Sequence, residues 1–316
     1  MNIPKSKHFQ LETLADGVYA AIASERGHAI CNAGLIDTGD RTIIFDTFIS
    51  PNPAKDLLKA AKTLYPRNTI RVINCHCHND HIRGNQVFPP DVDIYSTATT
   101  REGIINKEPE TIKWEKENIP KALADAKSKL RREKDPKRRQ TLTLSRVYYE
   151  AILKSHPKLV TRLPNVTFEG SLVMHGSRRR VELLTLAGHT DSDLVLILPD
   201  EKTAFMSDLL FVNYHPFLPG CSPEIFRRSL REVGKLGVQT LVPGHGPVGG
   251  PTDLSLLDQY IQTLEGIARE IVKEGKPLKE IRLQPVPPPF DEWSQFFEDL
   301  FAMNLGFLVK YVSQGV

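Results

Sequence analysis

The chain has 316 residues, of which 40% are hydrophobic, so it can bury the core of one large domain or two modest ones. Lys and Arg number 41 against 38 Asp and Glu, which argues against whole-molecule attraction to nucleic acid or to an anionic membrane. No segment approaches the roughly 18 apolar residues of a membrane span, and the N-terminus lacks an apolar signal segment. Four cysteines without a CxxC pair suit a reducing compartment. We therefore expect a soluble, cytoplasmic globular protein.

Short β-branched runs alternate with turn signals over the first hundred residues, which predicts a sheet with a helix packed on it. The strand-like runs include 17–24, 41–48, 70–75 and 92–96, and the helical pattern covers 53–65. A short helix-like segment follows at 97–105.

The character of the sequence changes between about 106 and 157, where apolar residues at helical spacing are mixed with dense charge. This pattern predicts an inserted pair or trio of helices. From Lys107 to Arg139, Lys and Arg outnumber Asp and Glu by 12 to 7. Such an excess is typical of a solvated helix face, and the alternative is a contact surface for an acidic partner such as nucleic acid.

Strand-like runs resume from 165 to 211, so the strands form two sets separated by the insert, which suggests two half-sheets. Further predicted elements are helices at 223–237 and 253–274, with a strand at 238–246 between them. A proline-rich linker at 283–290 precedes an amphipathic helix at 291–312. We expect this C-terminal extension, from about 285 to 316, to cover its own domain, with homodimer formation as the alternative.

The segment HCHNDH, residues 76–81 with its preceding Cys75, combines metal-ligand side chains at close spacing. His76 and His78 stand at i and i+2 after an apolar strand, so both side chains can point to one ion. Asp80 and His81 follow where a helix is expected to begin, and one turn there can aim both at a second ion. Cys75 and Cys77 alternate with the histidines, so we expect them to face away from the metal.

Three further residues of ligand type lie at predicted strand ends, where each follows an apolar run. They are His189 in LAGHT, Asp208 in FMSDLLF and His245 in VPGHG. A metal site needs its ligands on such rigidly held edges. Together with the first cluster, these residues predict a metal centre.

The ordered motifs HCHNDH, GHT, SDLLF and PGHG, preceded by TIIFDT, resemble the metallo-β-lactamase fold superfamily over about residues 17–250. The resemblance implies a single domain over 1–316, an α/β protein built as a four-layer αββα sandwich of two mixed sheets. It also implies a dinuclear centre, usually of two zinc ions, with manganese or iron as alternatives. His76, His78 and His189 would hold one ion, Asp80, His81 and His245 the other, and Asp208 would bridge them. Asp46 resembles the carboxylate that supports the metal loop from outside the ligand set.

The chemistry expected of such a centre is hydrolysis by a metal-bridging hydroxide, because two close metal ions lower the pKa of a shared water. Asp80 could orient that hydroxide or carry its proton. Tyr214 and His215 follow Asp208 in the loop, and either could donate a hydrogen bond to a substrate.

Departures from subfamily patterns narrow the function. Asp208 stands where zinc β-lactamases carry Cys or Ser, and the bridging Asp resembles the glyoxalase II and lactonase branches. Phe211 occupies the position of a tyrosine in acyl-homoserine lactonases. We expect a metal-dependent hydrolase of an ester, thioester, lactone or related carbonyl substrate, with the insert as a wall of the pocket. The alternatives are a phosphodiester or nucleic-acid hydrolase, β-lactam hydrolysis, a mononuclear iron oxidoreductase of persulfide-dioxygenase type, and a non-catalytic scaffold.

Overall fold

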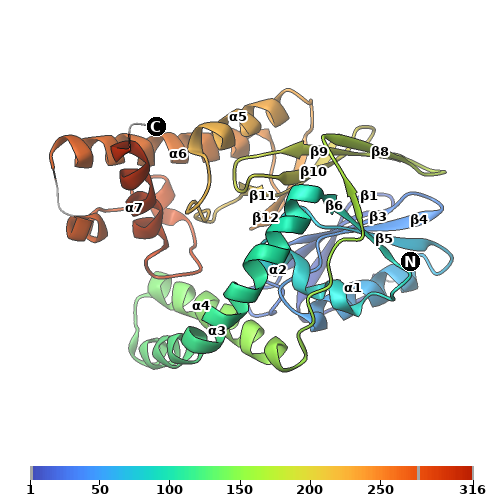
Figure 1. The fold of residues 1–316 in the computed structure, drawn as a ribbon, viewed down its shortest axis with the longest axis horizontal. Coiled ribbons are helices and arrows are strands. Elements are labelled where there is room, and N and C mark those ends of the chain that lie inside the picture. Colours follow the sequence, from blue (N-terminus) through green and yellow to red (C-terminus); the bar gives the residue numbers. More distant parts are fainter. Residues whose placement is uncertain (1–2, 276–277, 315–316) are drawn as a thin grey trace.

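The computed structural model describes residues 3–275 and 278–314 and has two β-sheets packed face to face (Figure 1). The first sheet has the strand order β1-β2-β3-β4-β5-β6-β7. Its strands are β1 Phe9–Ala15, β2 Val18–Ala23, β3 Ala33–Asp37, β4 Arg41–Phe45, β5 Thr69–Ile73, β6 Asp93–Thr97 and β7 Val166–Phe168. Strands β1 to β4 are antiparallel, and β4 to β7 are parallel.

The second sheet has the order β12-β11-β10-β9-β8. Its strands are β8 Ser171–His175, β9 Arg180–Leu186, β10 Asp193–Leu198, β11 Thr203–Phe211 and β12 Thr240–His245. The pairs are antiparallel except for β11 and β12, which run parallel. Both sheets are therefore mixed, as expected from the sequence.

The helices of the described residues are α1 Pro51–Leu64, α2 Asn79–Ile82, α3 Ala98–Arg132, α4 Pro136–Ser155, α5 Pro223–Gly234, α6 Pro251–Lys273 and α7 Leu300–Ser313. Helix α1 packs on the outer face of the first sheet, and α5 and α6 pack on that of the second. Short 3-10 turns are η1 Arg83–Val87, η2 His156–Lys158, η3 Leu278–Leu283 and η4 Phe290–Glu292. In the described part of the chain, no helix combines the length and the apolar character needed to cross a membrane.

Side chains that point alternately to the two faces of each sheet explain the four layers. In β10, Leu194 and Leu196 contribute to the core between the sheets, whereas Val195 and Ile197 pack beneath α5 and α6. In β4, Ile43 and the residues facing the same way join the inter-sheet core, while Ile44 packs on the α1 side. Because side chains of successive strand residues point to opposite faces, each strand serves two apolar layers. This αββα arrangement confirms the predicted fold class.

Three expectations about the elements differ from the structure. The first helix of the insert begins at Ala98, because Thr97 caps it by accepting a hydrogen bond from the Thr100 amide. From there the helix runs without a break to Arg132. The first strand after the insert, β7, pairs with β6, so the insert interrupts the first sheet and does not separate the two. The last helix begins at Leu300 rather than near 291, after a turn and an irregular segment.

Candidate metal centre

All the ligand-type residues singled out by the sequence lie together at one end of the two sheets. His76 and His78 follow β5, Asp80 and His81 lie in α2, His189 follows β9, Asp208 lies within β11, and His245 ends β12. The sequence predicts Asp208 at the end of a strand. The strand instead continues to Phe211, and its pairing with β12 becomes irregular around Ser207, which turns the Asp208 carboxylate into the cluster.

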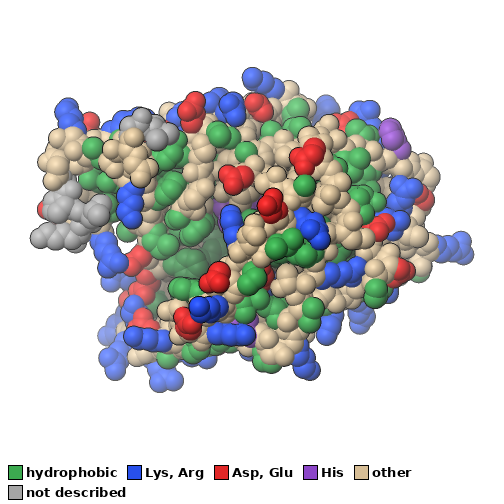
Figure 2. All heavy atoms as spheres, in the orientation of Figure 1, with side chains coloured by type: hydrophobic (Ala, Val, Ile, Leu, Met, Phe, Trp, Pro, Cys, Tyr) green, Lys and Arg blue, Asp and Glu red, His purple; other side chains and the backbone are tan. Residues whose placement is uncertain are grey.

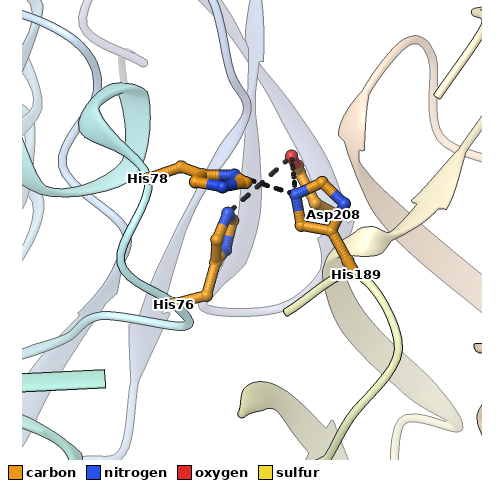
Figure 3. Close-up of side chains that lie close together, drawn as sticks. All are labelled: His76, His78, His189 and Asp208. Carbon is orange, nitrogen blue, oxygen red and sulfur yellow. Dashed lines mark hydrogen bonds and ion pairs between the residues drawn. The ribbon is translucent and has the colours of Figure 1, made fainter. Parts of the chain in front are cut away.

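The first group of candidate ligands consists of His76, His78, His189 and Asp208, drawn in Figure 3. The His189 Nε2 atom lies 2.9 Å from His78 Nδ1 and 3.2 Å from Asp208 Oδ2. His76 Nε2 lies 3.9 Å from the same carboxylate oxygen. One ligand atom of each residue lies within 4.8 Å of the others, so the group can hold one ion.

The second group consists of Asp80, His81 and His245. His245 Nε2 lies 3.4 Å from Asp80 Oδ2, and His81 Nε2 lies 3.7 Å from it. Both rings also face Asp208 Oδ1, at 3.4 Å from His245 and 3.2 Å from His81. The two oxygens of Asp208 therefore face different groups, with Oδ2 directed at the first and Oδ1 at the second.

The donor set fits metal ions because several of its buried polar atoms have no hydrogen-bond partner. These atoms include His76 Nε2, His81 Nε2 and Asp208 Oδ1, all of which lie inside the cluster. An unpartnered buried polar atom costs free energy unless a ligand satisfies it. Imidazole nitrogens and carboxylate oxygens are the ligands that zinc and related metals prefer.

The electrostatics of the cluster keep its carboxylates ionised. Burial alone would raise the pKa of Asp80, but His81 and His245 lower it to about 2. Burial also opposes the charged form of His245, yet Asp208 and Asp80 raise its pKa to about 9. Burial lowers the pKa of the His78 imidazole to about 3 and keeps that ring neutral, whereas His245 would release its proton when a metal ion binds.

The backbone around the cluster is strained. Ile30, Asp46 and Ser207 have φ angles of 77°, 64° and 48°, a backbone region that residues other than glycine rarely adopt. Ile30 is β-branched, and its carbonyl accepts a hydrogen bond from His245 Nδ1 at 3.2 Å. Such strain concentrates at functional sites, where the surrounding structure holds the residue in place. Gly244 shows the same crowding, because a Cβ atom there would collide with the Asp208 carboxylate.

Asp46 contacts the cluster from outside the two ligand groups. Its Oδ2 atom lies 2.9 Å from His81 Nδ1, and its Oδ1 atom accepts a hydrogen bond from the Cys75 amide at 2.9 Å. A carboxylate on Nδ1 orients the ring so that Nε2 faces the cluster.

The cysteines next to the motif lie outside the cluster. Cys75 Sγ contacts His76 Nδ1 at 2.9 Å, on the side of the ring away from the unpartnered Nε2. Cys75, His76 and His81 could form a further ligand group on that side, but burial and Asp46 raise the pKa of the Cys75 thiol well above its usual value. Cys77 packs against Ile82 and Ile104.

Two loop residues that the sequence suggested for substrate binding have other contacts. His215 lines the cavity beside the cluster, but its Nδ1 atom lies 3.0 Å from the Tyr260 hydroxyl, and burial lowers its pKa to about 4. The Tyr214 ring stacks on Phe296 at a centroid distance of 5.5 Å and lines a separate small cavity.

The sequence reasoning missed several residues that hold the site in place. Asp193 accepts hydrogen bonds from the amides of His189 and Thr190, and so holds the His189 loop. Arg83, directly after α2, is buried between Glu108 and Glu115 of α3. Asp193 lies only three residues after the GHT motif, so its role could have been predicted from the sequence. The contacts of Arg83 with Glu108 and Glu115 join residues 25 and 32 positions apart, and sequence spacing does not predict such pairs.

A family model described as the metallo-beta-lactamase superfamily matches residues 26–245, a span that contains every residue of both ligand groups. The chain belongs to the metallo-beta-lactamase superfamily. Solved structures with the same fold include the metallo-beta-lactamase from Pontibacter korlensis, with a TM-score of 0.57 and 16% identity, over 80% of this chain and 99% of that one. The DIM-1 metallo-beta-lactamase aligns with a TM-score of 0.57 and 14% identity, over 82% and 99%.

Two curated proteins align with the chain over shorter stretches. A hydroxyacylglutathione hydrolase of Mesorhizobium japonicum is 31% identical over 83 residues, which is 26% of this chain and 32% of the relative. The 2,4-dinitroanisole O-demethylase subunit alpha of Nocardioides sp. strain JS1661 is 30% identical over 125 residues, or 37% and 34%. The chain thus spans about one third of the length of these relatives.

Proposed function

We propose that this superfamily member is a hydrolase that holds two metal ions, zinc in the first instance, and cleaves an ester, thioester, lactone or related carbonyl compound. The observation that carries the proposal is the placement of Asp208, whose Oδ1 and Oδ2 atoms face different ligand groups. A carboxylate in that position can join two ions into one centre. Bound in this way, zinc would supply an activated water and a Lewis acid for the carbonyl oxygen.

The chain's own residues prepare the site for that chemistry. Asp46 fixes the His81 ring, and Asp193 fixes the loop that carries His189. Asp80 remains ionised at neutral pH and lies at the edge of the cavity, so its carboxylate can orient water or accept a proton.

The cavity next to the centre supports a small-molecule substrate. It has a volume of about 340 Å³, near the lower end of the range for small-ligand pockets. Of the basic stretch 107–139, only Lys107, Glu108 and Thr111 line the cavity, and the run of Lys and Arg at 127–139 lies outside its lining. A phosphodiester or nucleic-acid substrate is therefore less well supported than a carbonyl compound. The two curated relatives are named for different reactions, so the cavity is the better guide to the substrate.

Metal analysis and a substrate screen test the proposal together. Purified protein should contain about two zinc ions per chain and hydrolyse at least one ester, thioester or lactone. Loss of a residue that only hydrogen-bonds a metal ligand lowers activity by about 10- to 100-fold. Asp80→Ala and His189→Ala each remove a proposed ligand, so each should lower activity by more than that and should also bind less metal. His175→Ala, an exposed histidine on β8, is the matched control.

Several outcomes would contradict the proposal. One iron per chain without zinc would favour an oxidoreductase, and turnover confined to phosphodiesters or β-lactams would favour those alternatives. Full activity in Asp80→Ala or His189→Ala would show that the clustered residues do not carry the reaction.

A further inference from the structure

The cavity beside the candidate metal centre has an aromatic wall built from three distant parts of the chain. His78, Asp80, Asp208 and His245 form its metal-facing side. The rest of the lining includes apolar residues from the insert, from the end of β11 and the loop after it, and from the C-terminal segment: Tyr148, Phe211, Phe217, Phe296, Phe297 and Leu300. Figure 2 shows hydrophobic side chains gathered in a hollow between the α3 helix and the C-terminal helices.

The C-terminal part of this wall lies beyond the residues that the superfamily model matches. The Phe296 ring meets the His245 ring edge-on at a centroid distance of 5.2 Å, and Phe297 meets Tyr148 in the same way at 5.3 Å. The Ser145 hydroxyl of α4 donates a hydrogen bond to the Phe296 carbonyl at 2.5 Å. The insert and the C-terminal segment therefore join over the centre and hold these rings at its edge.

The rings retain accessible apolar surface. Tyr148, Phe217, Phe296 and Phe297 are all half-buried, although they stand in a concave site. Apolar surface gathered in a hollow marks a ligand site, and aromatic side chains interact best with another ring in an edge-on or offset arrangement. A ring of a bound molecule would find such partners on several sides.

The charges around the cavity point to an uncharged ligand. Apart from the metal-facing residues, its charged lining residues are Lys107 and Glu108. The Glu108 carboxylate is engaged by Arg83 at 2.7 Å, and Lys107 lies on the exposed side of α3. Outside the metal-facing side, Lys107 is the one cation among the described lining residues, and its exposed position gives a phosphate or carboxylate group no buried partner.

We propose that this cavity binds an uncharged ester or thioester that carries one aromatic ring close to the scissile carbonyl bond. The inference rests on the proposed hydrolase function and specifies its substrate class. In the reaction the oxygen of water bonds to the carbonyl carbon, and the bond from that carbon to the alcohol oxygen or thiol sulfur breaks. The products are a carboxylic acid and an alcohol or thiol. A cavity of about 340 Å³ that also includes the metal-facing space accommodates one ring of a small molecule.

Three esters test the assignment with the full zinc-loaded chain: methyl phenylacetate, benzyl acetate and methyl acetate. Burial of a ring favours binding enough to give roughly a tenfold or greater preference in kcat/KM for at least one aromatic ester over methyl acetate. Phe297→Ala should remove most of that preference, because it should lower kcat/KM for the aromatic ester more than kcat/KM for methyl acetate. The control is Trp114→Ala, which removes an exposed aromatic ring of α3 outside the cavity.

A binding measurement separates this inference from the proposed function. Phenylacetamide should bind the protein in calorimetry at least about tenfold more tightly than acetamide, and Phe297→Ala should weaken it. Equal kcat/KM for the three esters, together with equal binding of the two amides, would overturn the aromatic assignment while the hydrolase function stands. Absence of hydrolysis of any ester, thioester or lactone would overturn the proposed function. Selective phenylacetamide binding that depends on Phe297 would still support the aromatic site in that case.

Discussion

His215 makes the stability of the protein depend on pH in the acid range. Its side chain is buried beneath the cavity, in contact with Tyr260, and burial lowers its pKa from 6.5 to about 4. The folded state therefore binds its proton less readily than the unfolded state does. This contribution to stability is fully present above pH 6.5 and is lost as the pH falls through 4. The shift corresponds to about 3 kcal/mol of unfolding free energy.

We expect His215→Gln to flatten that dependence. Urea unfolding of wild type and variant at several pH values between 7 and 4 gives the difference in unfolding free energy, from which contributions common to both proteins cancel. As the pH falls from 7 to 4, the unfolding free energy of the wild type should decrease by about 3 kcal/mol more than that of His215→Gln. His175→Gln, at an exposed site on β8, should show no such trend. A difference independent of pH would mean that His215 titrates normally.

Individual residues differ in how far the sequence alone reveals them. His76, His189 and Asp208 could be predicted because metal ligands are few in chemical type and must follow rigid strands. Phe296 and Phe297 could not be predicted as cavity residues. An aromatic side chain in an amphipathic segment has the same sequence pattern whether it fills a core or borders a hollow.

At the scale of elements, a buried ionic network ties the metal-ligand helix α2 to the insert. The Arg83 side chain is 2% exposed and contacts Glu115 Oε2 at 2.9 Å. The same oxygen lies 2.7 Å from His156 Nε2, while the Asn79 amide donates to Glu115 Oε1 at 2.8 Å. Glu115 therefore joins α3, the end of α4 and the residue directly before Asp80.

Removal of this carboxylate should be costly, because it leaves the Arg83 charge buried with one partner fewer. We expect Glu115→Ala to lower the unfolding free energy by about 3–5 kcal/mol and to weaken zinc binding through displacement of Asn79. Chemical denaturation and a zinc titration measure the two effects. Glu115→Gln retains the oxygen that Asn79 contacts and should lose less, and Glu110→Ala, at an exposed site of α3, should be neutral. A loss in Glu110→Ala equal to that in Glu115→Ala would contradict this role.

The order of strands and helices follows from the sequence more readily than their partners do. Short apolar runs rich in β-branched residues locate strands such as β5 and β10, because the composition of such a run is a local property. The pairing of β7 with β6 across the insert is not local, and three residues carry too little pattern to show which sheet they join. The start of α7 escaped prediction because apolar residues of the preceding irregular segment continue the helical pattern.

At the scale of the whole molecule, the C-terminal segment is part of the main core. Trp293 is 5% exposed and stacks on Tyr260 of α6 at a centroid distance of 5.2 Å. Phe301, Leu305 and other residues of α7 join the same apolar cluster as β11 and α5. An element that shares its core with the second sheet should unfold together with it.

The two tryptophans of the chain allow a direct test of that cooperativity, since Trp114 is 57% exposed on the insert and Trp293 is buried. In Trp114→Phe, Trp293 becomes the sole fluorescent reporter of the C-terminal segment. Its emission should shift to longer wavelength at the same urea concentration at which the far-UV circular dichroism is lost. Coincident midpoints are expected because separation of the segment would expose the apolar faces of both α6 and α7 to water.

An earlier change in fluorescence would show that the segment detaches while the sheets remain folded. The aromatic wall over the candidate metal centre would then be a movable cover, because Phe296 and Phe297 lie only a few residues beyond Trp293 in the same segment.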